Sequence, residues 1–182
     1  VSELEADQNA GENTSGLKRD YAFEYSAGIY EPMTLMIPDF YGGSSSNFLV
    51  SAEDSEVRQA LQQANNPQLA NQLARYTSAY WGPQSASAPY YAGAIICFLF
   101  VLGLMYAPRN MVIWCTFIFA LGIMLSWGSN WEAFNYAMFD FFPGYNKFRS
   151  VTFAIIISLF VMPLLGFVGL EAFLSSEKSK EK

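Results

Sequence analysis

Two basic side chains, Lys147 and Arg149, flank Phe148 immediately before a long apolar run at residues 151–173. Arginine binds phosphate through paired N–H bonds, and lysine binds it as a point charge. The start of a helix adds free backbone N–H groups and partial positive charge. The pair therefore predicts a site for a lipid phosphate at the membrane surface. The alternative is a pair of interfacial anchors that reach toward lipid head groups.

Three further side chains in the first half of the chain are suited to sugar chemistry. Asp39, in Ile-Pro-Asp-Phe beside a glycine-containing loop, is the best carboxylate candidate. Ordinary turn chemistry is the alternative explanation for it. Trp81 and Tyr80 could stack on a sugar ring, and anchoring at a membrane interface explains them equally well.

Other kinds of site are disfavoured by composition. The chain has no histidine, which removes the commonest general base and metal ligand. Its two cysteines, Cys97 and Cys115, lie inside apolar runs and are interpreted as small apolar side chains. A net charge of −6 without a basic stripe argues against a nucleic-acid partner. We expect no cofactor, with a divalent metal left open.

The elements that must position these residues differ between the two halves. Residues 1–88 carry eleven acids and four bases, whereas three apolar runs dominate residues 89–174. The runs at 90–107 and 111–127 have no charge, and the run at 151–173 has one acid near its end. A membrane core of about 30 Å needs about 20 apolar helical residues. We therefore predict three transmembrane helices rather than buried helices of a soluble protein.

The third predicted span contains features of close helix packing. Pro163 lies in its middle and is expected to kink the helix. Gly166 and Gly169 follow and leave the helix thin on that stretch. Small residues let helix backbones approach closely in a membrane, so this part of the span is expected to pack against another helix.

Lysine and arginine counts predict the orientation of the spans. The link at 108–110 holds one base and the tail at 175–182 holds three, against two in the loop at 128–149. Cytoplasmic segments carry the excess of bases. The charged tail is thus predicted to be cytoplasmic, with residues 1–88 and the loop 128–149 extracytoplasmic. That loop is rich in aromatic residues, and we expect a helix in the interface or dipping into the membrane.

The polar half is predicted to contain a small α+β domain. Residues 1–16 are acidic and lack apolar periodicity, which predicts disorder. Alternation at 21–25 favours a strand within the extracytoplasmic loop domain 17–88. Ser51 could cap one short helix, and Asn66 before Pro67 could begin a second. Because the chain begins polar and has no signal peptide, we expect an upstream span.

Several stretches together resemble one family of bacterial membrane proteins. The most specific are Trp81-Gly82 with Gln84, and the run Pro-Gly-Tyr-Asn-Lys-Phe-Arg at 143–149. Residues 16–43, 80–104, 125–152 and 162–167 resemble the YfhO family in its Bacteroidetes form. That family is similar to the GT-C class of glycosyltransferases. The resemblance implies that the chain is a C-terminal or internal fragment of a polytopic α-helical protein of the bacterial inner membrane.

The resemblance also implies a function and its partners. Such enzymes take a sugar from a polyprenyl-phosphate carrier at the outer face and modify cell-envelope glycoconjugates. The implied partners are the bilayer, the lipid-linked donor, an envelope acceptor and the remaining transmembrane helices. The class carries its catalytic carboxylate in an N-terminal portion that has no counterpart here, so this piece alone is expected to be inactive. The implied substrate-binding residues are Trp81, Gln84, Tyr145, Asn146, Lys147 and Arg149.

A non-enzymatic multi-pass membrane protein is the alternative, either a transporter component or a scaffold for envelope assembly. Transporters more often carry charged residues within their spans. Here the predicted spans are uncharged apart from Glu171. This difference favours chemistry in the outer loops.

Overall fold

The computed structural model describes residues 17–51, 55–63, 68, 72–73, 76–84, 87 and 90–180. This part of the chain is mostly helical. The α-helices are α2 (Arg19–Ala22), α3 (Glu56–Gln62), α5 (Ala94–Tyr106), α6 (Arg109–Ser126), α7 (Glu132–Phe141) and α8 (Ile155–Lys180). The 3-10 turns are η1 (Glu31–Leu35), η2 (Leu49–Ser51), η3 (Gly128–Trp131), η4 (Tyr145–Lys147) and η5 (Val151–Ala154).

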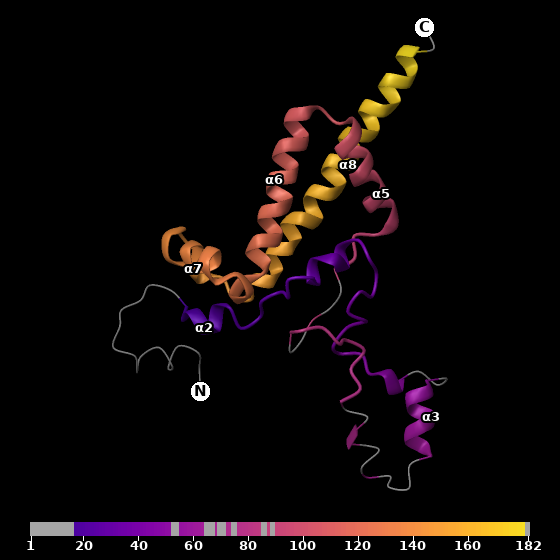
Figure 1. Ribbon diagram of the computed structural model, residues 1–182, viewed down its shortest axis with the longest axis vertical. Coiled ribbons are helices and arrows are strands. Elements are labelled where there is room, and N and C mark those ends of the chain that lie inside the picture. Colours follow the sequence, from indigo (N-terminus) through magenta and orange to yellow (C-terminus); the bar gives the residue numbers. More distant parts are fainter. Residues whose placement is uncertain are drawn as a thin grey trace.

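Helix α8 lies between α5 and α6 and packs along both (Figure 1). Two stretches are long and apolar enough to span a membrane, namely α6 and the stretch Val151–Ser176, which combines η5 with most of α8. In the apolar 18-residue window of each stretch, 17% and 44% of the residues respectively are buried. The core helix of a soluble protein is mostly buried, so the low burial is consistent with helices that face lipid.

The first predicted span is shorter than expected. Residues 90–107 are helical only from Ala94 to Tyr106, because Gly93 adopts a φ of 94° and directs the chain out of the helix. Thirteen residues rise about 20 Å at 1.5 Å per residue. A hydrocarbon core is about 30 Å thick. The prediction of three helices of spanning length is therefore not supported, and two remain.

The third predicted span differs at both ends. Residues 151–154 form η5, and α8 continues to Lys180 into the predicted charged tail. Pro163 lies inside α8 without ending it. Proline lacks the backbone N–H that would donate one helical hydrogen bond. The helix nevertheless continues on both sides of Pro163.

Helices α5 and α8 touch through glycine. A Cβ atom at Gly169 would overlap the Cα of Gly103 and lie 2.7 Å from its backbone N. A Cβ atom at Gly166 would lie 2.8 Å from the Cβ of Leu99. Contact between α6 and α8 is similarly close, since a Cβ at Gly122 would lie 2.6 Å from Ser158 Oγ. Small residues thus set the spacing of all three helices.

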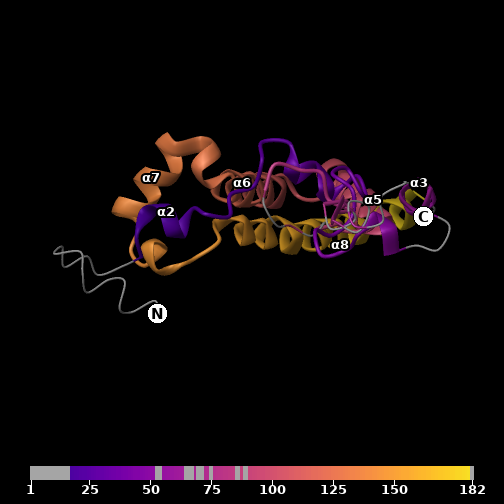
Figure 2. The ribbon, with the colours of Figure 1, turned by 90° about the horizontal axis from the view of Figure 1, so that it is seen from below.

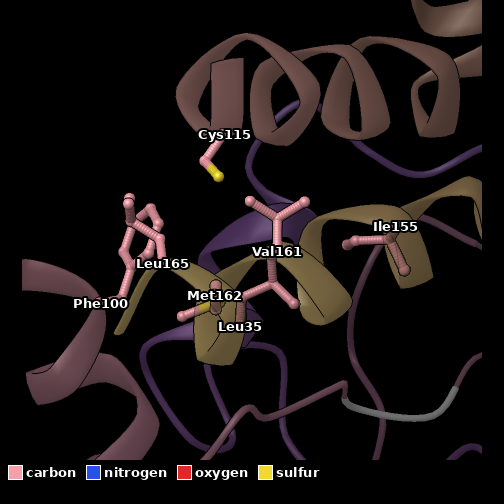
Figure 3. Close-up of a cluster of buried hydrophobic side chains, with 7 residues drawn as sticks. All are labelled: Leu35, Phe100, Cys115, Ile155, Val161, Met162 and Leu165. Carbon is pink, nitrogen blue, oxygen red and sulfur yellow. The ribbon is translucent and has the colours of Figure 1, made fainter. Parts of the chain in front are cut away.

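The largest buried cluster joins the three long helices to the polar half. Leu35, from η1, is 1% exposed and lies among residues of α5, α6 and α8 (Figure 3). Leu35 therefore packs η1 against the long helices. The buried members of the cluster are Leu35, Phe100, Cys115, Ile155, Val161, Met162 and Leu165.

The α+β prediction for residues 17–88 is wrong for the part of them that is described. It contains no strand, only isolated bridges, which link Gly42 with Phe40 and Tyr80, and Phe48 with Ser78. The strand expected at 21–25 is replaced by α2 and a following bend. The segment is not a strand because it lies beside helices. The ring of Phe23 packs on the aromatic residues of α7 and η4.

One predicted helix of the polar half is shifted and another lies outside the described residues. Helix α3 is capped by Ser55, whose Oγ accepts a hydrogen bond from the backbone N of Arg58 at 3.5 Å. The predicted cap, Ser51, belongs to η2 instead. The second predicted start, at 66–67, and the predicted disordered segment 1–16 lie outside the described residues.

The aromatic loop 128–149 contains η3, α7 and η4. Helix α7 runs across the ends of α6 and α8 instead of along them (Figures 1 and 2). At its C-terminal end Phe141 is 82% exposed and Phe142 is also exposed. An amphipathic helix in this position is suited to a membrane interface.

Candidate functional site

Residues 17–27 lie along the loop 126–152. The backbone N of Leu17 donates to the carbonyl of Asn146 at 2.9 Å, and that of Ala27 donates to Ser126 at 2.8 Å. Arg19 adds an ion pair of 2.7 Å with Asp140. These contacts hold the start of the polar half against the end of the helices where α6 finishes and α8 begins.

The predicted phosphate ligands, Lys147 and Arg149, lie in the turn before η5. Lys147 is exposed at the end of η4. Arg149 Nη2 lies 3.0 Å from Glu24 Oε2, and its guanidinium lies 4.3 Å from the centre of the Tyr21 ring. Ser150 and η5 separate it from the first residue of α8. A phosphate bound to Arg149 would therefore compete with a carboxylate and would not meet the start of α8.

Tyr145 and Asn146 are engaged within the fold. The Tyr145 hydroxyl donates to Oδ1 of the fully buried Asn135 at 3.1 Å, and Asn135 Nδ2 donates to the carbonyl of Met124 at 3.0 Å. Burial raises the pKa of Tyr145 to about 12. The carbonyl of Asn146 accepts from Leu17. Both residues therefore join α7 and the following turn to their neighbours.

Asp39 and Trp81 are brought to one turn. Asp39 adopts a left-handed φ of 53°, and its backbone carbonyl accepts a hydrogen bond from Gly42 N at 2.8 Å. The backbone N of Trp81 donates to Tyr41 O at 3.0 Å, and the two rings are 5.1 Å apart, edge to face. The Trp81 side chain is 67% exposed. The exposed indole can stack on a sugar ring, and the exposed Asp39 carboxylate can accept hydrogen bonds from sugar hydroxyls.

Gln84, the remaining predicted site residue, leads to a carboxylate that the sequence prediction missed. Glu31 is 6% exposed and accepts four hydrogen bonds. Its Oε2 accepts from Gly28 N and Gln84 Nε2, both at 2.7 Å. Its Oε1 accepts from the Tyr80 hydroxyl at 2.9 Å and Ser87 Oγ at 3.1 Å. Glu31 thus fastens the loop around residues 80–87 to η1.

The surroundings of Glu31 are largely closed to water. Burial is the main reason that the pKa of Tyr80 rises to about 12, and the bond to Glu31 acts in the same direction. A cavity of about 10 Å³ lies between Glu31, Tyr80, Ser87 and Thr152. That is about the space of one water molecule. With both carboxylate oxygens accepting two hydrogen bonds each, Glu31 is suited to a structural role.

A large apolar groove lies between η1 and the C-terminal half of α6. Its volume is about 570 Å³, within the usual range of about 300–1,000 Å³ for ligand pockets. Trp127 and Trp131 lie at the end near the loop 128–149, and no charged residue lines it. An uncharged, elongated ligand fits such a surface. The lining residues are Ile29, Tyr30, Pro32, Met33, Leu35, Met36, Phe119, Ala120, Ile123, Met124, Trp127 and Trp131.

The predicted site residues thus form separate groups. Asp39 and Trp81 share a turn, Gln84 lies behind it on Glu31, and residues 145–149 lie in the turn between α7 and η5. Among the residues that are described, no group of three or more histidine, cysteine, aspartate or glutamate side chains could hold a metal ion. Comparison of the chain with protein-family models, with curated proteins and with solved structures finds no match.

Two features of the site were missed by sequence reasoning. A signal for Glu31 existed, since it is the one acid between Glu24 and Asp39, within an otherwise uncharged stretch. An acid in such a stretch is costly to bury unless it is hydrogen-bonded, so it marks a polar network. The groove had no local signal, because its two walls come from segments far apart in the sequence.

Proposed function

We propose that this chain is the part of a multi-pass bacterial inner-membrane protein that binds a polyprenyl-phosphate-linked sugar for transfer to a cell-envelope glycoconjugate. The resemblance to YfhO-family proteins motivates the proposal. In this proposal α5, α6 and α8 all cross the membrane together with further helices of the same protein. The non-helical residues 90–93 lengthen the stretch of chain that crosses the membrane with α5. Residues 1–88 and the loop 128–149 face outward, and the C-terminal end of α8 is cytoplasmic.

The groove between η1 and α6 is the observation that carries this proposal. Its volume of about 570 Å³ and uncharged lining suit a flexible isoprenoid chain. One wall belongs to α6, a candidate membrane span, so a lipid chain would enter without first leaving the hydrocarbon. Trp127 and Trp131 at one end are typical of a membrane interface, where the phosphate of such a lipid would lie.

Polar ligands for the donor are assigned to the outer side. Lys147 is exposed and is proposed to contact the phosphate as a point charge, with Arg149 joining it when Glu24 is displaced. Trp81 and Asp39 lie in a separate group and are proposed to contact a sugar ring of the acceptor, with Gln84 supporting their turn through Glu31. No acid–base step is assigned to these residues, because the class carries its catalytic carboxylate elsewhere.

A non-enzymatic scaffold is the second candidate, and one observation favours it. Arg149, Tyr145 and Gln84 are all engaged in hydrogen bonds within the chain. In a scaffold these residues would serve only to hold the fold together. The exposed aromatic surfaces would bind other membrane helices. The two candidates differ in whether a lipid-linked sugar is bound and used.

Filling the groove tests the proposal. Ile123→Trp adds a large side chain on the α6 wall and is expected to reduce donor-dependent transfer by the whole protein at least about tenfold, or about 1.4 kcal/mol. The matched control is Ile113→Trp, which adds the same side chain at an exposed position of α6 outside the groove. Transfer is measured in membranes at equal protein abundance.

The outcomes separate the candidates. The proposal expects the control to transfer sugar at the wild-type rate. Equal transfer by both variants would remove the groove from donor binding. Absence of transfer by the wild-type whole protein, with no binding of the donor, would favour the scaffold.

A further inference from the structure

We infer that residues 29–37 form a re-entrant segment whose outer surface lies in the hydrocarbon of the outer leaflet. The segment belongs to the polar half of the chain and includes η1. The inference rests on the membrane location proposed above, and it concerns a different question, namely which surface of the protein the bilayer covers. Its partner is lipid hydrocarbon.

The depth of the segment follows from its contacts. Leu35 is buried in the cluster that contains Met162 of α8, and Figure 3 shows the two side chains next to each other. Met162 lies seven residues after the start of α8 at Ile155, which corresponds to about 10 Å along the helix. The carbonyl of Leu35 also accepts a hydrogen bond from Ala92 N at 3.0 Å, just before α5. A bilayer that covers α8 from Ile155 onward therefore also meets η1.

The outward side chains of the segment suit hydrocarbon. They include Tyr30, which is 67% exposed, and Met33, and all are apolar or aromatic. The one charged residue of the segment, Glu31, is buried and holds four hydrogen bonds. The exposed apolar side chains are Ile29, Tyr30, Met33, Met36 and Ile37.

Several carbonyl groups of the segment accept hydrogen bonds, and paired backbone groups are what a non-helical chain needs at membrane depth. Two side chains donate to this backbone, one from the residue that follows α6 and one from η1 itself. Trp127 Nε1 donates to the carbonyl of Ile29 at 3.1 Å, and Thr34 Oγ1 donates to that of Glu31 at 2.7 Å. The carbonyls of Gly28, Tyr30, Met33 and Leu35 accept from backbone N–H groups.

Continuity with a candidate span identifies lipid as the occupant. The exposed side chains Ile29, Tyr30, Met33 and Met36 form one wall of the groove, and α6 forms the other. The two walls form one continuous apolar surface, so the same lipid hydrocarbon can cover η1 and α6. Soluble proteins seldom leave an apolar patch of this kind uncovered.

Spin labelling in phospholipid vesicles tests the inference on the whole protein. Cys97→Ser and Cys115→Ala remove the native thiols, and single cysteines are placed at Met33, Asn47 and Phe160. The label at Met33 is expected to be more accessible to oxygen than to a water-soluble nickel complex. Phe160, 69% exposed on α8, should give the same result, and exposed Asn47 should give the reverse.

Each outcome decides one question. A Met33 label that meets the nickel complex, with Phe160 in lipid, overturns the re-entrant segment and leaves the membrane proposal standing. A Phe160 label that meets the nickel complex overturns the membrane proposal itself. A Met33 label protected from both reagents means that protein covers the segment, which also overturns the inference.

Discussion

Replacing Gly169 by leucine is expected to force α5 and α8 apart and to lower the free energy of unfolding by about 3 kcal/mol, at the upper end of what overpacking costs. The reason is that a Cβ atom at this position would overlap the Cα of Gly103, which is backbone and cannot rotate away. Thermal unfolding of the protein in detergent, followed by the loss of helical circular dichroism, measures the effect.

A matched control places the same side chain on the same helix. Ser175→Leu lies on an exposed part of α8 and is expected to unfold at the wild-type temperature. If Gly169→Leu were as stable as Ser175→Leu, the close contact between α5 and α8 would be contradicted.

Removal of the Glu31 side chain is expected to have the second large effect. Glu31→Ala leaves Gly28 N, Gln84 Nε2, Tyr80 Oη and Ser87 Oγ without their acceptor. An unsatisfied buried donor costs about 1–3 kcal/mol, and because part of this set can turn to water we expect about 3 kcal/mol in total. The loop around residues 80–87 should also become sensitive to added protease.

Glu24→Ala is the control for this prediction, because it removes an acid of the same type from an exposed pair. Glu24 and Arg149 are 46% and 43% exposed, and such pairs contribute about 0–1 kcal/mol. Equal stability and equal protease resistance of the two variants would show that Glu31 does not fasten the loop.

Helix positions could be predicted well from the sequence, whereas helix limits could not. Long uncharged runs locate α5, α6 and α8, because few charged residues can enter a hydrocarbon phase. Hydropathy carries no information on backbone angles. The positive φ of Gly93, which shortens α5, could therefore not be predicted from it. The thin stretch at Gly166 and Gly169 was predicted to pack closely, and α5 is the helix it contacts.

The polar half was harder, because its conformation is determined by distant residues. The alternation at 21–25 has the period of a strand, yet Phe23 is drawn to aromatic rings that follow it by more than a hundred positions. The partner of Arg149 is 125 residues away in the sequence, at Glu24. The residue pattern within a short window of sequence cannot predict either contact. The sequence therefore indicated which residues belong to the candidate site better than it indicated which residues they contact.

Photochemical crosslinking of the donor lipid tests whether the groove between η1 and α6 binds a polyprenyl chain. A polyprenyl phosphate with a diazirine in its isoprenoid chain is irradiated with the whole protein in vesicles, and labelled peptides are identified by mass spectrometry. We expect labels on residues 29–36 and 119–131, which are lost on competition with unlabelled polyprenyl phosphate. Labels spread over the exposed faces of α5 and α8, unaffected by the competitor and absent from the groove, would contradict donor binding in the groove.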